Sequence, residues 1–151
     1  MSAVNRAGVE LARRHLEGAG FRVRVAESPE SLELAKLWET VYRAAMIACW
    51  QEIHRISRKF GVDIKVVAEF VKEVHEVLGD RPIYYPDVIG GHCLIPNTKI
   101  LANVVNSDLL TFILRSNELR SREVKDPEIA EEINALKEVW KKLIPRSYYH
   151  L

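Results

Sequence analysis

Apolar residues recur every three or four positions along most of this chain, which predicts a mainly helical protein. The longest such stretch begins after Ser28, a good helix cap, and Pro29 suits the first helical position. The predicted helix runs to about Phe60, where Gly61 can end it. Apolar side chains occupy more than one of its faces, at Leu34, Leu37, Trp38, Val41, Ala44, Ala45, Met46, Ala48, Trp50 and Ile56.

Shorter helices are predicted on both sides of the long one. Asp63 can cap a helix that runs to about residue 78. Asn97 can cap another across residues 101–105, which continues or restarts near residue 107 towards residue 120. A first helix covers about residues 3–17, and a last amphipathic helix begins at residues 126–128 and is stopped by Pro145.

One short strand is predicted near the N-terminus. Residues 21–25 alternate apolar and polar side chains, which is typical of a half-buried strand. Because a single strand is unstable alone, it needs a partner, either residues 83–85 or a second subunit. The predicted fold class is therefore a mainly α-helical domain, built on one long helix, with a short N-terminal strand.

The composition of the 151 residues fits a single compact domain, with 48% hydrophobic and 28% charged residues. The chain has no run of 18 apolar residues and no signal-peptide pattern, so we expect a soluble cytoplasmic protein with no membrane partner. A net charge of +1 predicts no nucleic-acid partner. One basic segment is interleaved with acidic residues and is interpreted as a solvated surface. Its basic members are Arg115, Arg120, Arg122 and Lys125.

The candidate chemistry lies in the segment 84–97, where Gly90 and Gly91 precede His92 and Cys93. Adjacent glycines allow a ligand to approach the main chain closely. A thiol in such a loop, beside an imidazole and ahead of a helix start, can act as a nucleophile. The alternative is a tight turn into a helix, with Cys93 as a small buried hydrophobe and His92 hydrogen-bonded at the surface.

Only two cysteines are present, too few for a secreted disulfide framework. Cys49 falls in the middle of the long predicted helix among apolar residues, where a buried structural thiol is expected. The five histidines show no ligand spacing, and we predict no metal site.

The long helix carries Glu-Leu-Ala-Lys-Leu at residues 33–37 and Tyr-Arg-Ala at residues 42–44, and Gly-Gly-His-Cys follows at residues 90–93. In this order, the motifs resemble the central domain of the UDP-glucose/GDP-mannose dehydrogenase family, from about Ser28 to Ile100. The resemblance implies a helical fold like the C-terminal domain of 6-phosphogluconate dehydrogenase. It also implies that the long helix forms a homodimer, although it could instead be the core helix of a monomer.

The resemblance implies roles for individual residues. Cys93 matches the cysteine that attacks the C6 aldehyde of a nucleotide sugar, after a first hydride has gone to NAD; a second hydride transfer and hydrolysis of the thioester then yield a uronate. Lys36 matches the lysine that supports the developing oxyanion. Thr40 stands where the family usually has asparagine, and Asn97 where it has aspartate. Because an amide does not accept a proton at neutral pH, thioester hydrolysis by the family route is in question.

The family binds NAD through a dinucleotide-binding domain before the central one. In this sequence, no Gly-x-Gly-x-x-Gly follows a predicted strand, so we expect the chain alone to bind no NAD and to need a separate NAD-binding domain or chain. Residues 1–27 then correspond to a helix-strand remnant of such a domain, residues 28–100 to the family-like region, and residues 101–151 to C-terminal helices, within a single domain.

Three functions follow as hypotheses. The chain is the central part of an NAD-dependent nucleotide-sugar 6-dehydrogenase, inactive alone. Alternatively, it is a non-catalytic module that binds a nucleotide sugar through Lys36, Gly90, Gly91 and His92. In the third hypothesis it is purely a dimerisation domain.

Overall fold

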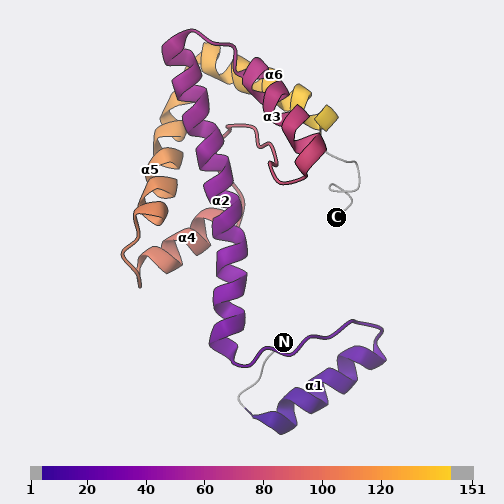
Figure 1. Ribbon diagram of the computed structural model, residues 1–151. Coiled ribbons are helices and arrows are strands. Elements are labelled where there is room, and N and C mark those ends of the chain that lie inside the picture. The colour runs from indigo at the N-terminus through magenta and orange to yellow at the C-terminus, as the bar shows by residue number, and fades with distance from the viewer. Residues whose placement is uncertain (1–4, 144–151) are drawn as a thin grey trace. The chain divides into compact units, whose positions relative to one another are not determined.

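The computed structural model describes residues 5–143, with side chains described as far as residue 137. The described residues form helices and no strand, which confirms the mainly helical fold class. The chain divides into two compact units, residues 1–40 and 41–151, whose boundary falls within the longest helix. The helices are α1 (Arg6–Gly18), α2 (Pro29–Phe60), α3 (Ile64–Leu78), α4 (Leu94–Ala102), α5 (Asp108–Glu123) and α6 (Pro127–Leu143) (Figure 1).

Two of these helices have the ends that their sequences predict. The hydroxyl of Ser28 accepts a hydrogen bond from the main-chain N–H of Ser31 at 3.1 Å, and α2 stops before Gly61, whose φ is +66°. The Asp63 carboxylate accepts from the N–H of Lys65 at 2.9 Å, and α3 ends at Gly79 with φ +70°. Capping side chains and left-handed glycines are local signals, and they locate these boundaries correctly.

The first unit contains α1, the segment after it and the beginning of α2. Asn5 caps α1 by accepting from the N–H of Gly8 at 2.7 Å, and α1 has no buried residue. The strand expected at residues 21–25 is not confirmed, since the structure assigns no regular secondary structure to residues 21–26. Residues 83–85 are also irregular, so this candidate partner forms no strand and supplies no main-chain ladder.

The second unit packs the later part of α2 against the helices that follow it. In Figure 1, α3 lies beside α6, and α4 lies beside α5; contacts join both pairs. Trp50 of α2 forms a buried cluster with Ile64, Ala68 and Leu136, against which Ile83 packs from the connection between α3 and α4. This cluster joins three helices and seats the segment that leads to the Gly-Gly-His-Cys motif.

Helix α4 begins at Leu94, so the expectation that Asn97 caps this helix is wrong. Cys93 occupies the cap position instead, and its main-chain oxygen accepts from the N–H of Asn97 at 2.9 Å, inside the first turn. Pro96 is compatible with that first turn because N–H groups there have no partner within the helix. The helix ends at Ala102 and a new one starts after Ser107, as one of the two predicted possibilities has it.

The last helix starts at Pro127, where the sequence predicts it, and Asp126 accepts from the N–H of Glu128 at 2.9 Å. The predicted stop at Pro145 lies outside the described residues. Among residues 5–143, no helix combines the length and the apolar character that crossing a membrane requires. The likeness to the 6-phosphogluconate dehydrogenase domain and the division at residues 27 and 100 stay predictions.

A layer of buried polar side chains joins α2 to α5. Arg120 of α5 is only 1% exposed, and its guanidinium donates to the main-chain oxygen of Gln51 at 2.9 Å and to Nδ1 of His54 at 3.0 Å. Burial lowers its pKa to about 10, although the nearby Glu123 carboxylate acts in the opposite direction. The interpretation of Arg120 as part of a solvated surface is therefore wrong, whereas the other three basic residues of that segment are exposed.

His54 is held in its neutral form between two charged groups. Because an arginine only donates, Nδ1 accepts from Arg120, and the ring proton on Nε2 is donated to Glu132 of α6 at 2.7 Å. Burial of the imidazole lowers the pKa of His54, outweighing the hydrogen bond to Glu132. For Glu132, partial burial acts to raise the pKa, but hydrogen bonds from Arg58 and His54 outweigh it and lower that pKa.

These shifts predict a loss of stability in mild acid. Below pH 6.5, the ordinary pKa of histidine, His54 binds a proton in the unfolded chain but stays neutral in the folded chain. The free energy of unfolding should therefore decrease as the pH is lowered, by at most about 1.4 kcal/mol per pH unit from this group. His54→Gln should flatten the profile between pH 7 and pH 5, measured by urea unfolding. The exposed His15→Gln is the matched control, and an equal effect of both variants would contradict the assignment.

Candidate functional site

The Gly-Gly-His-Cys motif forms the end of the connection between α3 and α4, within the second unit. Gly91 has φ +84°, a left-handed conformation in which a side chain would be strained. The chain turns there and enters α4, so that Cys93 stands at the cap of this helix. Both His92 and Cys93 are exposed, which contradicts the alternative of a buried Cys93. A thiol at a helix N-terminus lies where the helix dipole favours negative charge.

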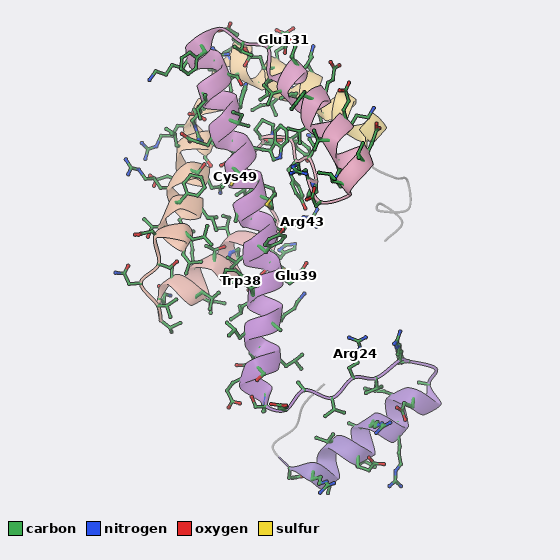
Figure 2. All side chains as sticks on the ribbon, viewed as in Figure 1. Arg24, Trp38, Glu39, Arg43, Cys49 and Glu131 are labelled. Atoms are coloured by element: carbon green, nitrogen blue, oxygen red, sulfur yellow. The ribbon has the colours of Figure 1, made fainter. Side chains whose placement is uncertain are left out.

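A cavity of about 390 Å³ lies along the same loop. Gly90 and Gly91 line it together with Tyr84 and Tyr85 of the loop and Arg43 of α2. Figure 2 shows Arg43 on α2, on the part of this helix that belongs to the second unit. The cavity thus offers glycine main chain, phenol rings and one guanidinium, groups that suit a hydroxylated or anionic ligand.

A cation from α6 lies against the start of this loop. The Lys137 ammonium is 3.7 Å from the Asp87 carboxylate and 5.2 Å from the centre of the Tyr85 ring. Asp87 also bends its carboxylate back to accept from the N–H of Val88 at 2.7 Å. The cavity wall at Tyr85 and Asp87 is therefore tied to the last described helix.

Two amides, the buried Gln51 and the half-buried Asn117, hold the main chain just before the glycines. Gln51 of α2 donates from Nε2 to the carbonyl oxygen of Asp87 at 2.8 Å. Asn117 of α5 accepts from the N–H of Ile89 at 2.7 Å and donates to the carbonyl oxygen of Ile89 at 3.3 Å. Sequence reasoning missed both residues, although Gln51 follows the apolar Ala44 and Ala48 at helical spacing on α2, a position where a polar side chain is a signal.

Lys36 and Thr40 belong to the first unit, on the early turns of α2. Lys36 is largely exposed, with its ammonium 3.7 Å from the Glu39 carboxylate. The Thr40 hydroxyl donates to the carbonyl oxygen of Leu37 at 2.8 Å, one turn back along its own helix. Within the second unit, the structure brings together Gly90, Gly91, His92, Cys93 and Asn97. An approach of Lys36 and Thr40 to Cys93 stays a prediction.

Cys49 is exposed on α2, so the expectation of a buried structural thiol is wrong (Figure 2). Its two chain neighbours, Ala48 and Trp50, are buried in the second unit, whereas the Cys49 side chain lies on the exposed side of the helix. The thiol is nevertheless desolvated by its surroundings, and this raises the pKa of Cys49. Among the residues with described side chains, no three His, Cys, Asp or Glu residues come together as a metal site would need.

These features define a class of protein: a helical domain that presents a cysteine at a helix N-terminus after a paired-glycine turn. A comparison with protein families matches residues 30–119 to the UDP-glucose/GDP-mannose dehydrogenase family, central domain. The matched segment contains both Lys36 and Cys93 and covers more than half of the chain. The chain therefore belongs to this family, as the two sequence motifs predict. No curated protein and no solved structure matches the chain.

The two cysteines should differ in reactivity. Cys93 is exposed at the cap of α4, whereas desolvation raises the pKa of Cys49 and so lowers its thiolate fraction at neutral pH. At neutral pH, iodoacetamide should therefore label Cys93 faster than Cys49. Quantitative mass spectrometry of the two peptides gives both rates in one sample. Faster labelling of Cys49 would count against Cys93 as the nucleophile.

Proposed function

We propose that this chain supplies the cysteine-bearing central domain of an NAD-dependent nucleotide-sugar 6-dehydrogenase. The observation that carries the proposal is the family match across residues 30–119, together with the exposed Cys93 at the cap of α4 beside a loop that lines a cavity. In this proposal, the cavity beside Gly90 and Gly91 accepts part of the nucleotide sugar, and Arg43 offers its positive charge to a phosphate or a sugar hydroxyl.

The proposed covalent step involves Cys93. Its thiolate sulfur adds to the C6 aldehyde carbon, a C–S bond forms, and the carbonyl π electrons move to the oxygen. Lys36 would stabilise the negative oxygen by its charge. The thiohemiacetal formed in this way would then lose a hydride from C6 to a dinucleotide held by another domain, which gives the thioester. Hydrolysis of the thioester breaks the C–S bond, places the hydroxyl of water on carbon, and returns the proton to sulfur.

In this proposal, the cofactor site comes from another domain and not from the residues of this chain. No Gly-x-Gly-x-x-Gly motif follows a strand pattern, and the residues around the motif loop include no such phosphate-binding turn. Oxidation of an alcohol to a carboxylate removes two hydrides, and a dinucleotide held by another domain, in a longer protein or a separate chain, would have to accept both. The chain alone should therefore form no uronate.

The two departures from the family weaken the hydrolytic half of the chemistry. The Thr40 hydroxyl proton is engaged by the Leu37 carbonyl, so this side chain would have to give up a bond to support an oxyanion. Asn97 lies in the first turn of α4, and its amide does not accept a proton from water at neutral pH. These two observations favour a second candidate function, a module that binds a nucleotide sugar without oxidising it.

We also propose that α2 pairs two copies of the chain. Val41, Ala44 and Ala48 are completely buried within the second unit, so they do not belong to such an interface. Leu34 and Trp38 lie four residues apart on the early part of α2 and are 55% and 49% exposed. Covering these large apolar side chains would stabilise a symmetric dimer.

Restoring the two family residues should restore hydrolysis. With an NAD-binding domain of the family supplied, Thr40→Asn combined with Asn97→Asp should raise uronate formation by about 10²–10⁴-fold, the contribution of a positioned acid or base. NADH absorbance and mass detection of the uronate measure this. The matched control is the same double variant carrying Cys93→Ser, which should form no thioester and no product.

The same variants separate the candidate functions. If UDP-glucose or GDP-mannose raises the melting temperature and the double variant still forms no product, the chain is a binding module. If neither sugar nucleotide changes the melting temperature of the folded protein, both the dehydrogenase and the binding proposals fail. The purely structural dimerisation role is then favoured.

The dimer should depend on Trp38. Trp38→Glu would bury an unpaired charge in the proposed interface, at a cost of about 3–5 kcal/mol, and should yield monomer in light scattering. Phe70→Glu on α3 also places a carboxylate at an exposed apolar position and is the matched control, which should stay dimeric. A wild-type chain that is monomeric at high micromolar concentration would contradict the proposal.

A further inference from the structure

The segment before Gly90 is irregular, so its main-chain groups find no partners in a helix or a sheet. Ile89 is only 4% exposed, and water therefore has little access to its N–H and carbonyl groups. A buried main-chain group without a partner costs about 1–3 kcal/mol. The side chains that satisfy these groups consequently decide which conformation the segment can take.

Asn117 satisfies both main-chain groups of Ile89 at once. Its Oδ1 accepts from the Ile89 N–H at 2.7 Å, and its Nδ2 donates to the Ile89 oxygen at 3.3 Å. This is the pairing that a neighbouring strand would offer to an extended residue. Among side chains, only an amide carries the donor and the acceptor side by side, so carboxylates and hydroxyls cannot make the same pair.

A directed chain of hydrogen bonds sets the second anchor, at Asp87. Arg55 donates from Nη1 to the Ser116 hydroxyl oxygen at 3.0 Å, so the hydroxyl proton points elsewhere, to Oε1 of Gln51 at 2.7 Å. With Oε1 accepting, Nε2 of Gln51 faces the Asp87 oxygen and donates to it at 2.8 Å. The completely buried Gln51 amide therefore has one orientation, and the chain of bonds transmits it to the loop.

Cys93 follows the anchor at Ile89 by four residues and the anchor at Asp87 by six. Between Ile89 and α4, Gly90 and Gly91 allow the main chain wide conformational freedom. We infer that Asn117 is a positioning residue for Cys93: it fixes the loop at Ile89, so that the glycine turn delivers the thiol to the cap of α4. This inference rests on the proposed role of Cys93 as nucleophile.

The test compares the alkylation of Cys93 with that of Cys49 in the same chain. Asn117→Ala removes both bonds to Ile89 and should lower the ratio of the Cys93 rate to the Cys49 rate about two- to fivefold, the size of effect that a helix terminus has on a charge. Asn117→Asp keeps the acceptor for the Ile89 N–H and should lower the ratio less. Ser121→Ala is the matched control on α5, because the Ser121 hydroxyl bonds only the main-chain oxygen of Asn117 at 2.9 Å.

Hydrogen exchange of the Ile89 amide and circular dichroism accompany the labelling. Faster exchange at Ile89, with unchanged helix content and a lowered ratio, supports positioning. Faster exchange with an unchanged or raised ratio overturns it, because the loop would then be loosened without consequence for Cys93. If Asn117→Ala does not fold, the comparison of Asn117→Asp with Ser121→Ala decides in the same way.

Failure of the proposed function is a separate outcome. A wild-type chain in which Cys93 reacts no faster than Cys49 counts against the nucleophile, whatever the variants do. A wild type that labels Cys93 preferentially, with the same preference in both Asn117 variants, leaves the nucleophile in place and overturns the positioning role alone.

Discussion

The burial of the Arg120 guanidinium constrains the whole second unit. Removing a charge of this kind from water costs several kcal/mol unless hydrogen bonds replace the lost hydration. The replacements come from α2, through the Gln51 carbonyl and the His54 ring, while Glu123 supplies the opposite charge. A slide of α5 along α2 by one turn would leave a buried cation without acceptors, so these two helices have one admissible register.

Gln51 connects this constraint to the motif loop. Its main-chain oxygen accepts from Arg120, while its side chain accepts from Ser116 and donates to Asp87. The register of α2 and α5 thereby determines where the irregular segment around Asp87 lies. Asn117, one turn before Arg120 on α5, adds the second anchor at Ile89. Rigid helices thus position a loop whose own sequence, with two glycines, would leave it loose.

Helix boundaries were the part of this fold that local sequence chemistry predicts best. Ser28, Asp63 and the left-handed Gly79 each act within a few residues, and the observed ends of α2 and α3 agree with them. Asn97 misled because its type suits a cap, but the main chain had already entered the helix at Leu94. The strand at residues 21–25 failed for a different reason: alternation shows that a segment could pair but supplies no partner.

The candidate site likewise contains some residues that the sequence reveals and others that it does not. The paired glycines and Cys93 stand out in the sequence because they are contiguous, and their family motif is specific. The helical spacing of Gln51 from Ala44 and Ala48 is a signal, but it does not identify a partner for Gln51. Asn117 carries no such signal, and the two amides lie 36 and 28 residues from the groups they bind. On an amphipathic helix, a polar residue looks the same in sequence whether water or another helix covers it. The burial of His54 and Arg120 was hidden for that reason.

The long separations of these contacts have a consequence for the order in which the chain acquires its structure. Ile89 precedes its partner Asn117 in the chain, and His54 precedes its hydrogen-bond partner Glu132 by 78 residues. During synthesis, the loop around Cys93 therefore leaves the ribosome before the helix that holds it. Until α5 docks, the loop lacks its anchor at Ile89 and the Ser116 hydroxyl that orients the Gln51 amide, so the geometry around Cys93 can be completed only after α5 has formed.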